Sequence, residues 1–174
     1  MTLQRIYLIG FMGSGKSFVG RRLSKALGVT FVDLDRLLEQ TYHLSINDFF
    51  TRYGENAFRQ AEKSVLHSSQ YLSSGIISTG GGTPCYFDNI SWMKENGYTV
   101  YLKMSAGALC HRLMESKKPR PLLRDVNGCD LLPFIEAKLK DREAYYSQAD
   151  LIYPGENLSI TEFSAKLKEV LNID

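Results

Sequence analysis

The residues best suited to chemistry form one stretch near the N-terminus, Gly10-Phe11-Met12-Gly13-Ser14-Gly15-Lys16-Ser17. Its glycines allow backbone conformations that a Cβ forbids, so successive N–H groups can point at one chain of phosphates. Lys16 can reach the β- and γ-phosphates of a nucleotide, and the Ser17 hydroxyl can bind a magnesium ion that bridges them. A glycine-rich turn could match by chance, but the full pattern between an apolar run and a helical one favours nucleotide binding.

Two carboxylates, Asp33 and Asp35, follow the second expected strand. An aspartate at a strand-to-helix junction commonly caps the helix, which accounts for one of them. Two acids separated by one residue after an extended segment can also face the same crevice, near the phosphate loop. In a phosphoryl-transfer site, one acid can support the magnesium shell while the other orients an acceptor hydroxyl or takes its proton. We predict such a role for at least one of the two.

Arg59 lies three residues before Glu62 in a predicted helix. A salt bridge on the helix surface is a common result of this spacing. Alternatively, Arg59 binds an anionic substrate bidentately while Glu62 holds its guanidinium in place. The spacing alone leaves both interpretations open. Arg142, in a later helix, has the same two alternatives of a surface salt bridge and an anion clamp.

Three consecutive glycines, Gly80 to Gly82, follow the third expected strand. Such a run is costly in conformational entropy. A close approach of the backbone to a ligand therefore explains it better than a flexible turn does.

The segment 116–128 contains two prolines and four cations and has no apolar period, which predicts an exposed, mobile loop. An ordinary solvated basic patch is one interpretation. Nucleic-acid binding would call for interleaved aromatic residues and a wider basic surface. Beside a phosphate-binding loop, a cationic loop suits a lid that closes over the phosphates and excludes water. Arg120, between Pro119 and Pro121, is its most constrained cation.

Apolar runs and helical periods alternate along the chain, which predicts a parallel sheet covered by helices on both faces. Side chains near the carboxyl ends of such strands project into the crevice where ligands bind. The expected strands cover residues 6–9, 30–32 (a short buried strand), 75–78, 98–102 and 151–153. The expected helices cover residues 18–27, 36–42, a stretch capped by Ser45, 55–72 after a break at Gly54, 89–96, 105–115, 131–149 and 160–171.

Length and composition place bounds on the protein. Its 174 residues, with 44% hydrophobic and 23% charged side chains, fit one soluble globular domain. A net charge of +2 is too small to indicate binding to nucleic acid or to an anionic membrane, and no apolar run approaches the ~20 residues that span a bilayer. The N-terminus runs directly into the first strand without an export signal, so we expect a cytoplasmic protein. Cys85, Cys110 and Cys129 have no paired spacing and predict neither disulfides nor a zinc site.

Taken in order, these motifs resemble those of the shikimate kinases, small P-loop kinases of aromatic amino-acid biosynthesis that are similar to nucleoside monophosphate kinases. The resemblance extends from the phosphate loop to about Tyr146. It implies an α/β, three-layer P-loop kinase fold with a central five-stranded parallel sheet, substrate-binding helices at about 34–62 and a mobile lid at about 116–128. It also implies transfer of the γ-phosphoryl group of ATP to the 3-hydroxyl of shikimate, with Mg²⁺ as cofactor, by a monomer.

The resemblance further implies roles for single residues. Asp35 would bind the shikimate hydroxyls and act as a base, and Arg59 of the Phe-Arg-x-x-Glu element would bind the carboxylate together with Arg142. Arg120 of the Arg-Pro-Leu-Leu motif would approach the transferred phosphoryl group, while Phe50 and Phe58 would form apolar walls. The expected site residues are Lys16, Asp35 and Arg120 for catalysis; Gly13, Ser14, Gly15, Lys16, Ser17, Phe18 and Arg120 for ATP; Asp35, Arg59, Gly81 and Arg142 for shikimate; and Ser17 and Asp33 for Mg²⁺.

Two positions depart from the family pattern. Many relatives have a basic residue near the last strand that stacks on adenine, and residues 154–158 offer none. Arg112 matches the arginine before the lid only loosely, because its spacing to Arg120 differs by about one residue. A gluconate- or nucleotide-type kinase is the nearest alternative, but it leaves Arg59, Arg142 and the three glycines together unexplained. A non-catalytic P-loop regulatory protein is the other, and the acidic pair and Arg120 argue against it.

Overall fold

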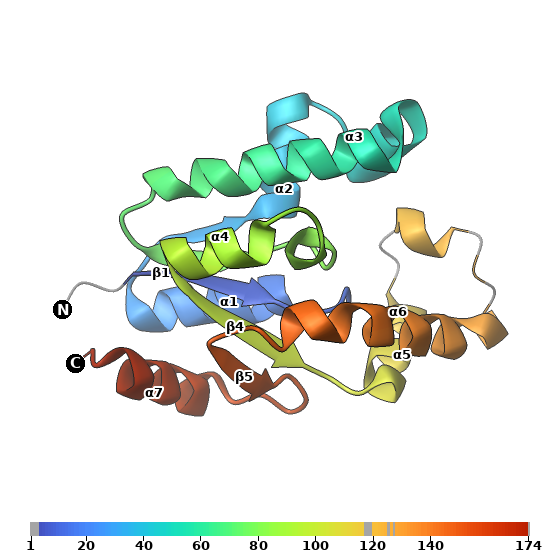
Figure 1. Ribbon diagram of the computed structural model, residues 1–174. Helices are drawn as coiled ribbons and strands as arrows, with labels where there is room; N and C mark the ends of the chain where they lie inside the picture. Colours follow the sequence, from blue (N-terminus) through green and yellow to red (C-terminus); the bar gives the residue numbers. More distant parts are fainter. Residues whose placement is uncertain (1–3, 117–119, 125, 127, 174) are drawn as a thin grey trace.

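A five-stranded parallel sheet with strand order β2-β3-β1-β4-β5 forms the centre of the computed structural model, which describes residues 4–116, 120–124, 126 and 128–173 (Figure 1). This confirms the predicted sheet. Its strands are β1 (Arg5–Ile9), β2 (Phe31–Asp33), β3 (Gly75–Ser78), β4 (Tyr98–Lys103) and β5 (Leu151–Pro154).

Burial differs between the middle and the edges of the sheet. All four residues of β3 are buried, whereas every residue of β2 is only half-buried. The expectation of a buried second strand is therefore wrong, because β2 lies at the edge of the sheet and pairs only with β3. The register places Asp33 opposite Ser78, so that polar side chains gather where these two strands end.

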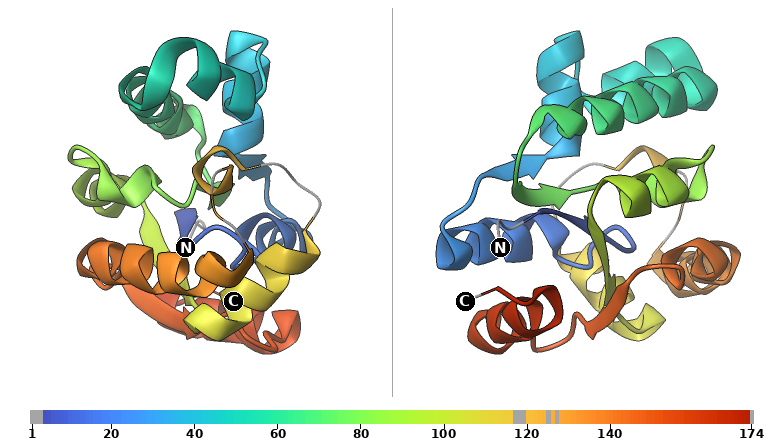
Figure 2. Two further views of the ribbon diagram at one scale, coloured as in Figure 1. Left: turned by 90° about the vertical axis from the view of Figure 1, so that its right-hand side faces the viewer. Right: turned by 60° about the vertical axis from the view of Figure 1, so that its left-hand side comes forward.

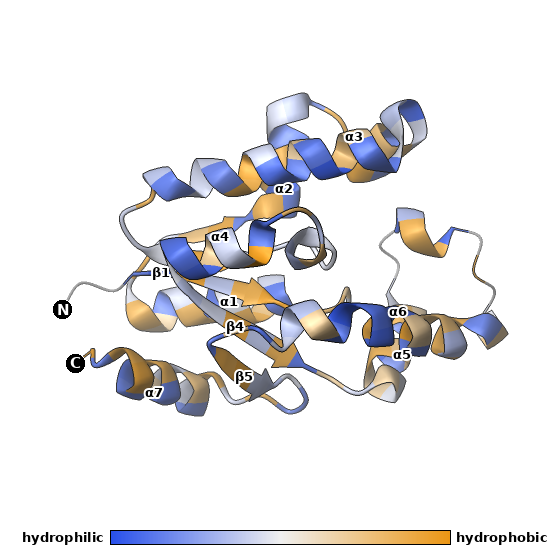
Figure 3. Cartoon of the chain, viewed as in Figure 1, coloured by the Kyte–Doolittle hydropathy of each residue, from blue (hydrophilic) through white to orange (hydrophobic). Residues whose placement is uncertain are grey.

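Helices cover both faces of the sheet, which gives the three predicted layers (Figure 2). One core cluster joins Ile6 and Leu8 of β1 to helices α1 and α7, and the other joins Tyr7 and Ile9 of the same strand to α2, α3, α4 and α6. Alternate residues of β1 thus supply opposite faces. The helices are α1 (Lys16–Leu27), α2 (Leu34–Tyr42), α3 (Ile46–Ser68), α4 (Asn89–Asn96), α5 (Ala106–Glu115), α6 (Leu131–Tyr146) and α7 (Ile160–Leu171). Figure 3 shows blue and orange alternating along α7, as expected of an amphipathic helix.

Several predicted helix boundaries are wrong by a few residues, among them the start of α1, which begins at Lys16 instead of residue 18. Helix α2 begins at Leu34 instead of residue 36, because the Asp33 carboxylate caps it. Helix α3 ends at Ser68, and the chain tightens into a 3₁₀ turn over Ser69–Tyr71 before residue 72. Helix α6 ends at Tyr146 because residues 147–149 form a tight turn, in which the Ala149 N–H donates to the Tyr146 carbonyl.

The predicted helix cap at Ser45 and the predicted helix break at Gly54 are confirmed. Ser45 caps α3, and its hydroxyl both accepts from the Asp48 N–H and bonds the Asp48 carboxylate. Gly54 breaks the helical backbone inside α3, with φ 76° and ψ 175°, a conformation reached almost only by glycine. None of the helices in the described ranges combines the length and apolar character needed to cross a membrane.

Candidate active site

The phosphate loop joins β1 to α1 as predicted, and its glycines adopt backbone angles closed to other residues. The φ angles of Gly10, Gly13 and Gly15 are 139°, 86° and 90°. A Cβ at Gly10 would also lie 2.9 Å from the Leu102 carbonyl oxygen of the neighbouring strand. Backbone sterics therefore restrict the loop geometry, and the loop leads directly into the start of α1, where anions bind favourably.

Lys16 is buried at the centre of this loop, with 7% of its surface exposed. Its Nζ donates to the carbonyl oxygens of Gly10 at 2.7 Å and Phe11 at 2.9 Å. Burial lowers the pKa of Lys16 to about 8; Asp35 opposes this shift and Arg120 adds to it. The ammonium therefore lies within the electrostatic field of both the acidic pair and the lid arginine.

The two acids of the predicted pair have different surroundings. Asp33 caps α2 by accepting from the N–H groups of Asp35 at 3.2 Å and Arg36 at 3.4 Å. Asp35 lies in the first turn of α2 and lines the cavity described below. Asp33 is thus the helix cap and Asp35 lines the cavity, and both act on the Lys16 ammonium, so the expectation that the two acids face one crevice stays a prediction.

Ser17 lies beside the end of β3. Its Oγ is 3.2 Å from the Oγ of Ser78, the residue that pairs with Asp33 in the sheet. Two hydroxyls and a carboxylate are thus grouped at the phosphate loop, and oxygen donors of this kind suit Mg²⁺. Both expected magnesium residues, Ser17 and Asp33, belong to this group.

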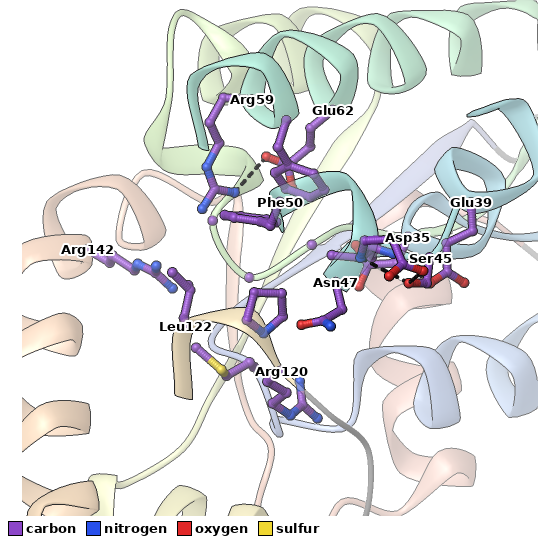
Figure 4. Close-up of a pocket in the computed structure, with 18 residues that line it drawn as sticks. Asp35, Glu39, Ser45, Asn47, Phe50, Arg59, Glu62, Arg120, Leu122 and Arg142 are labelled. Carbon is purple, nitrogen blue, oxygen red and sulfur yellow. Dashed lines mark hydrogen bonds and ion pairs between the residues drawn. The ribbon is translucent and has the colours of Figure 1, made fainter. Parts of the chain in front are cut away.

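A cavity of about 480 Å³ opens between α2, α3, the glycine run and the turn after Arg120 (Figure 4). It brings together Asp35, Arg59, Gly81, Arg120 and Arg142, which are far apart in sequence. The expected apolar walls also lie here, with the rings of Phe50 and Phe58 separated by 4.4 Å. The lining residues are Met12, Asp35, Glu39, Ser45, Ile46, Asn47, Asp48, Phe50, Phe58, Arg59, Glu62, Gly80, Gly81, Gly82, Arg120, Pro121, Leu122 and Arg142.

Arg59 is held by two carboxylates inside this cavity. Its Nη1 donates to Glu62 at 2.9 Å, and its Nη2 and Nε donate to Glu55 at 2.9 and 3.2 Å. The ring of Tyr86 lies 4.2 Å from the guanidinium. Burial lowers the pKa of Arg59, but Glu62 and Glu55 outweigh that effect and leave it raised. The sequence left undecided whether Arg59 forms a salt bridge with Glu62. The salt bridge is present, and it is buried in the cavity wall instead of exposed on a helix surface.

Arg142 and Arg120 differ from Arg59 in having no carboxylate bonded to them among the described residues. Arg142 is 7% exposed, its guanidinium lies 5.3 Å from the ring centre of Phe11, and its Nη1 is buried without a hydrogen-bond partner in the described structure. The Nε of Arg120 is likewise buried and unpartnered there. Burial lowers the pKa of Arg120, and Asp35 opposes the shift. Unsatisfied buried donors are costly, so two of them at one cavity indicate an anionic ligand.

The three glycines permit close contacts within the protein. None of them has a positive φ. A Cβ at Gly80 would lie 2.5 Å from Glu62 Oε1, one at Gly81 would lie 2.9 Å from the Met12 N, and one at Gly82 would lie 2.6 Å from Arg59 Nη1. The predicted close approach is thus to the phosphate loop and to the Arg59 ion pair, while the predicted contact of Gly81 with a ligand stays a prediction.

The predicted lid is described in part. Residues 117–119, 125 and 127 lie outside the described residues, and so do the expected cations Lys117 and Lys118. Arg120 leads into the 3₁₀ turn η3 (Pro121–Leu123), and a second turn, η4, covers Gly128–Asp130. The expectation of a wholly exposed loop is wrong, because Leu123 and Val126 pack against the apolar cluster around Phe11, α5 and α6. A bond from the Val126 N–H to the Leu123 carbonyl places these two side chains on one side of a turn.

The side of the site expected to bind the nucleotide has fewer side-chain contacts than the cavity. Arg112 Nη1 donates to the Ser14 carbonyl oxygen at 3.3 Å, so this loosely matched arginine does reach the phosphate loop. Phe18 is 58% exposed, with the Arg22 guanidinium 4.3 Å from its ring centre. In the segment that lacks the adenine-stacking cation, Glu156 accepts from the Ser105 N–H at 2.8 Å and so caps the start of α5.

Sequence reasoning missed several residues that shape the cavity. Glu55 carried a signal, because it precedes Arg59 by four residues on the same helix face. Tyr86, which donates to Glu55 at 2.9 Å, carried none, because it follows the glycine run far along the chain. Asn47 also lines the cavity, but in the sequence it is one polar residue among several at the start of α3.

Similar proteins were found both by sequence and by structure. The family model for shikimate kinase matches residues 12–172. The chain belongs to the shikimate kinase family. A shikimate kinase from Parabacteroides distasonis is 40% identical over 156 residues, which cover 90% of each chain. One from Bacteroides fragilis is 38% identical over 173 residues, with 97% of each chain covered.

Solved structures of shikimate kinases superpose over nearly the whole chain. The crystal structure from Bacteroides thetaiotaomicron has a TM-score of 0.90 at 35% identity and covers 99% of this chain and 100% of its own. The enzyme from Acinetobacter baumannii, solved in complex with shikimate, has a TM-score of 0.89 at 31% identity and covers 98% and 94%. A gluconokinase from Sinorhizobium meliloti, with a TM-score of 0.57 at 17% identity, shares the fold alone.

Proposed function

We propose that the cavity binds shikimate and the phosphate loop binds ATP, so that the γ-phosphoryl group is transferred to the 3-hydroxyl of shikimate. ATP-dependent phosphorylation of shikimate is the activity of the family to which this chain belongs. The observation that carries the assignment of the cavity is a pair of buried nitrogens, on Arg120 and Arg142, that have no hydrogen-bond partner among the described residues; both arginines line one cavity with Asp35 beside the phosphate loop.

Arg59 and Arg142 are the proposed partners of the substrate carboxylate. The bonds from Arg59 to its two glutamates leave one N–H on each terminal nitrogen for a ligand. Arg142 bears the positive charge that no described ion pair compensates, so it supplies most of the attraction for an anion. Gly81 and Asp35 then hold the ring on the opposite side, with Phe50 and Phe58 against its apolar surface.

The transfer itself requires positioning and charge neutralisation more than covalent help. The acceptor oxygen attacks the γ-phosphorus, the bond to the β–γ bridging oxygen breaks, and the hydroxyl proton passes to Asp35. Lys16 remains largely charged at neutral pH, since its pKa is about 8, and it stabilises charge on the phosphoryl group together with Arg120. Ser17, with Asp33 in support, would hold Mg²⁺, which would supply charge neutralisation at the phosphates.

A coupled assay of ADP release tests this proposal. Shikimate, gluconate and nucleoside monophosphates are offered in turn as acceptors, with Mg²⁺-ATP as donor. We expect turnover with shikimate alone. Turnover with gluconate or a nucleotide would assign the cavity to another acceptor, and nucleotide binding without any turnover would favour a regulatory protein.

We further propose that the protein is a cytoplasmic monomer. Light scattering after size-exclusion chromatography tests its oligomeric state.

A further inference from the structure

Arg124 joins the turn after Arg120 to the substrate-binding helix α3. Its Nη2 donates to Asn47 Oδ1 at 3.0 Å and to Thr51 Oγ1 at 3.1 Å. Asn47 and Thr51 are four residues apart, so they lie one turn apart on the same face of α3. Figure 4 shows the side chain of Asn47 reaching toward the part of the chain that bears Arg120 and Leu122. Arg124 itself is not among the residues that line the cavity.

The acceptor on Thr51 is held in the orientation that Arg124 requires. The Thr51 hydroxyl donates its hydrogen to the Asn47 carbonyl oxygen at 2.9 Å, which leaves lone pairs of Oγ1 for the guanidinium. Hydrogen bonds from a charged donor are stronger than those between neutral groups.

The other side of the same turn is fixed to the nucleotide half of the site. Leu123 packs against the cluster that includes Phe11 and Met12 of the phosphate loop. Within the turn, the Leu123 N–H donates to the Arg120 carbonyl at 3.0 Å and the Arg124 N–H to the Pro121 carbonyl at 3.3 Å. A short hydrogen-bonded turn therefore touches the donor half through Leu123 and the acceptor half through Arg124.

We propose that Arg124 is a positioning residue, which ties this turn to α3 through Asn47 and Thr51 and so holds Arg120 and Leu122 over the acceptor. The inference rests on the proposed function, because it concerns the alignment of Arg120 with bound shikimate. The loss of Arg124 should therefore lower kcat/KM for shikimate. The phosphate loop, and with it the KM for ATP, should be unaffected.

The variants that test this are Arg124→Ala, Thr51→Val and the double variant, with Thr41→Val as matched control. Thr41 is an exposed threonine on α2 whose hydroxyl makes the same kind of bond, to the Leu37 carbonyl at 2.8 Å, with no arginine bonded to it in the described structure. We expect kcat/KM for shikimate to fall about fivefold in Arg124→Ala and in Thr51→Val, and no further in the double variant. Thr41→Val should equal the wild type. Effects that multiply in the double variant, or a Thr51→Val enzyme no slower than Thr41→Val, would overturn the proposal.

Hydrogen exchange, measured on the full chain without ligands, provides a second readout. In Arg124→Ala and Thr51→Val, loss of the contact should speed exchange at the amides of residues 123 and 124. Exchange at these amides should be unchanged in Thr41→Val. Unchanged exchange in Arg124→Ala and Thr51→Val would also overturn the proposal. This readout separates the two hypotheses. If the wild type fails to phosphorylate shikimate while exchange responds as expected, the proposed function fails and the contact stands. If the wild type is active while the variants match the control in both readouts, the contact alone fails.

Discussion

The phosphate loop takes its shape from the backbone, whereas the acceptor cavity takes its shape from ion pairs between side chains. In the loop, glycines at positive φ and carbonyl bonds to Lys16 define the geometry within one strand–loop–helix unit. In the cavity, Arg59 is fixed by Glu55 and Glu62, and Glu62 also accepts from the Thr83 hydroxyl at 2.7 Å. The donor half should therefore depend on few side chains, and the acceptor half on a coupled network.

Lys16→Ala should produce the largest effect and the most local one. Removing the ammonium takes away the main charge beside the transferred group, so we expect kcat to fall on the order of 10²–10³-fold. The far-ultraviolet circular dichroism spectrum should not change, because the bonds that Lys16 makes lie within the loop and no helix or strand depends on them. Lys25→Ala, which alters a lysine in the last turn of the same helix, is the matched control. Retained turnover in Lys16→Ala would remove this residue from the chemistry.

Arg59→Ala and Arg142→Ala should both weaken shikimate binding, and the two variants should differ in stability. Loss of Arg59 leaves Glu62 buried at 4% exposure without its partner, and breaking a buried pair costs about 3–5 kcal/mol. Loss of Arg142 breaks no described ion pair, so the melting temperature of the Arg142→Ala variant should stay closer to that of the wild type. Calorimetric titration with shikimate and thermal unfolding measure the two quantities. Wild-type affinity in Arg59→Ala, or equal melting temperatures in the two variants, would contradict the comparison.

The pH dependence of the donor half follows from the pKa of Lys16, which burial lowers to about 8. Above that pH the ammonium loses its proton, so kcat/KM for ATP should fall about tenfold per pH unit. Between about 8 and the ordinary value of 10.5, the unfolded chain binds more protons than the folded one. The contribution of this group to the free energy of unfolding therefore rises with pH in that window.

The control for this dependence is Lys16→Arg, which stays charged throughout the range. Its residual activity should lack the alkaline fall. A wild-type profile that is flat from about pH 7 to pH 9 would contradict a titrating Lys16.

Tyr86→Phe should have the smallest effect, confined to the acceptor half. It removes the bond from the tyrosine hydroxyl to Glu55 but keeps the ring beside the Arg59 guanidinium. We expect the KM for shikimate to rise about threefold, the size of one modest hydrogen bond, with the KM for ATP unchanged. A rise in the KM for ATP larger than the rise in the KM for shikimate would contradict the separation of the donor half from the acceptor half.

The sequence predicted the strand–loop–helix structure of the donor half well because its parts are contiguous. One strand, one loop and one helix place Gly10 to Ser17, and the alternation of strands and helices gives the sheet around them. Asp33 shows the limit: its cap to α2 follows a local rule, but which of the two acids lines the cavity depends on tertiary packing. The status of Arg59 stayed open because sequence spacing does not reveal burial. The packing of Leu123 and Val126 was missed because a period of three residues in a short turn has no helical or strand signature.

The break at Gly54 has a consequence for how the acceptor is recognised. In an uninterrupted α-helix each residue turns about 100° around the axis, so residues nine apart, such as Phe50 and Arg59, would point to nearly opposite sides. Yet the Arg59 guanidinium lies 5.9 Å from the Phe50 ring centre. One glycine with open space around it changes the rotational phase of α3, so that the ring of Phe50 and the guanidinium of Arg59 line the same cavity. Selectivity for the acceptor thus depends on the rotational phasing of two helical segments as well as on the side chains that each presents.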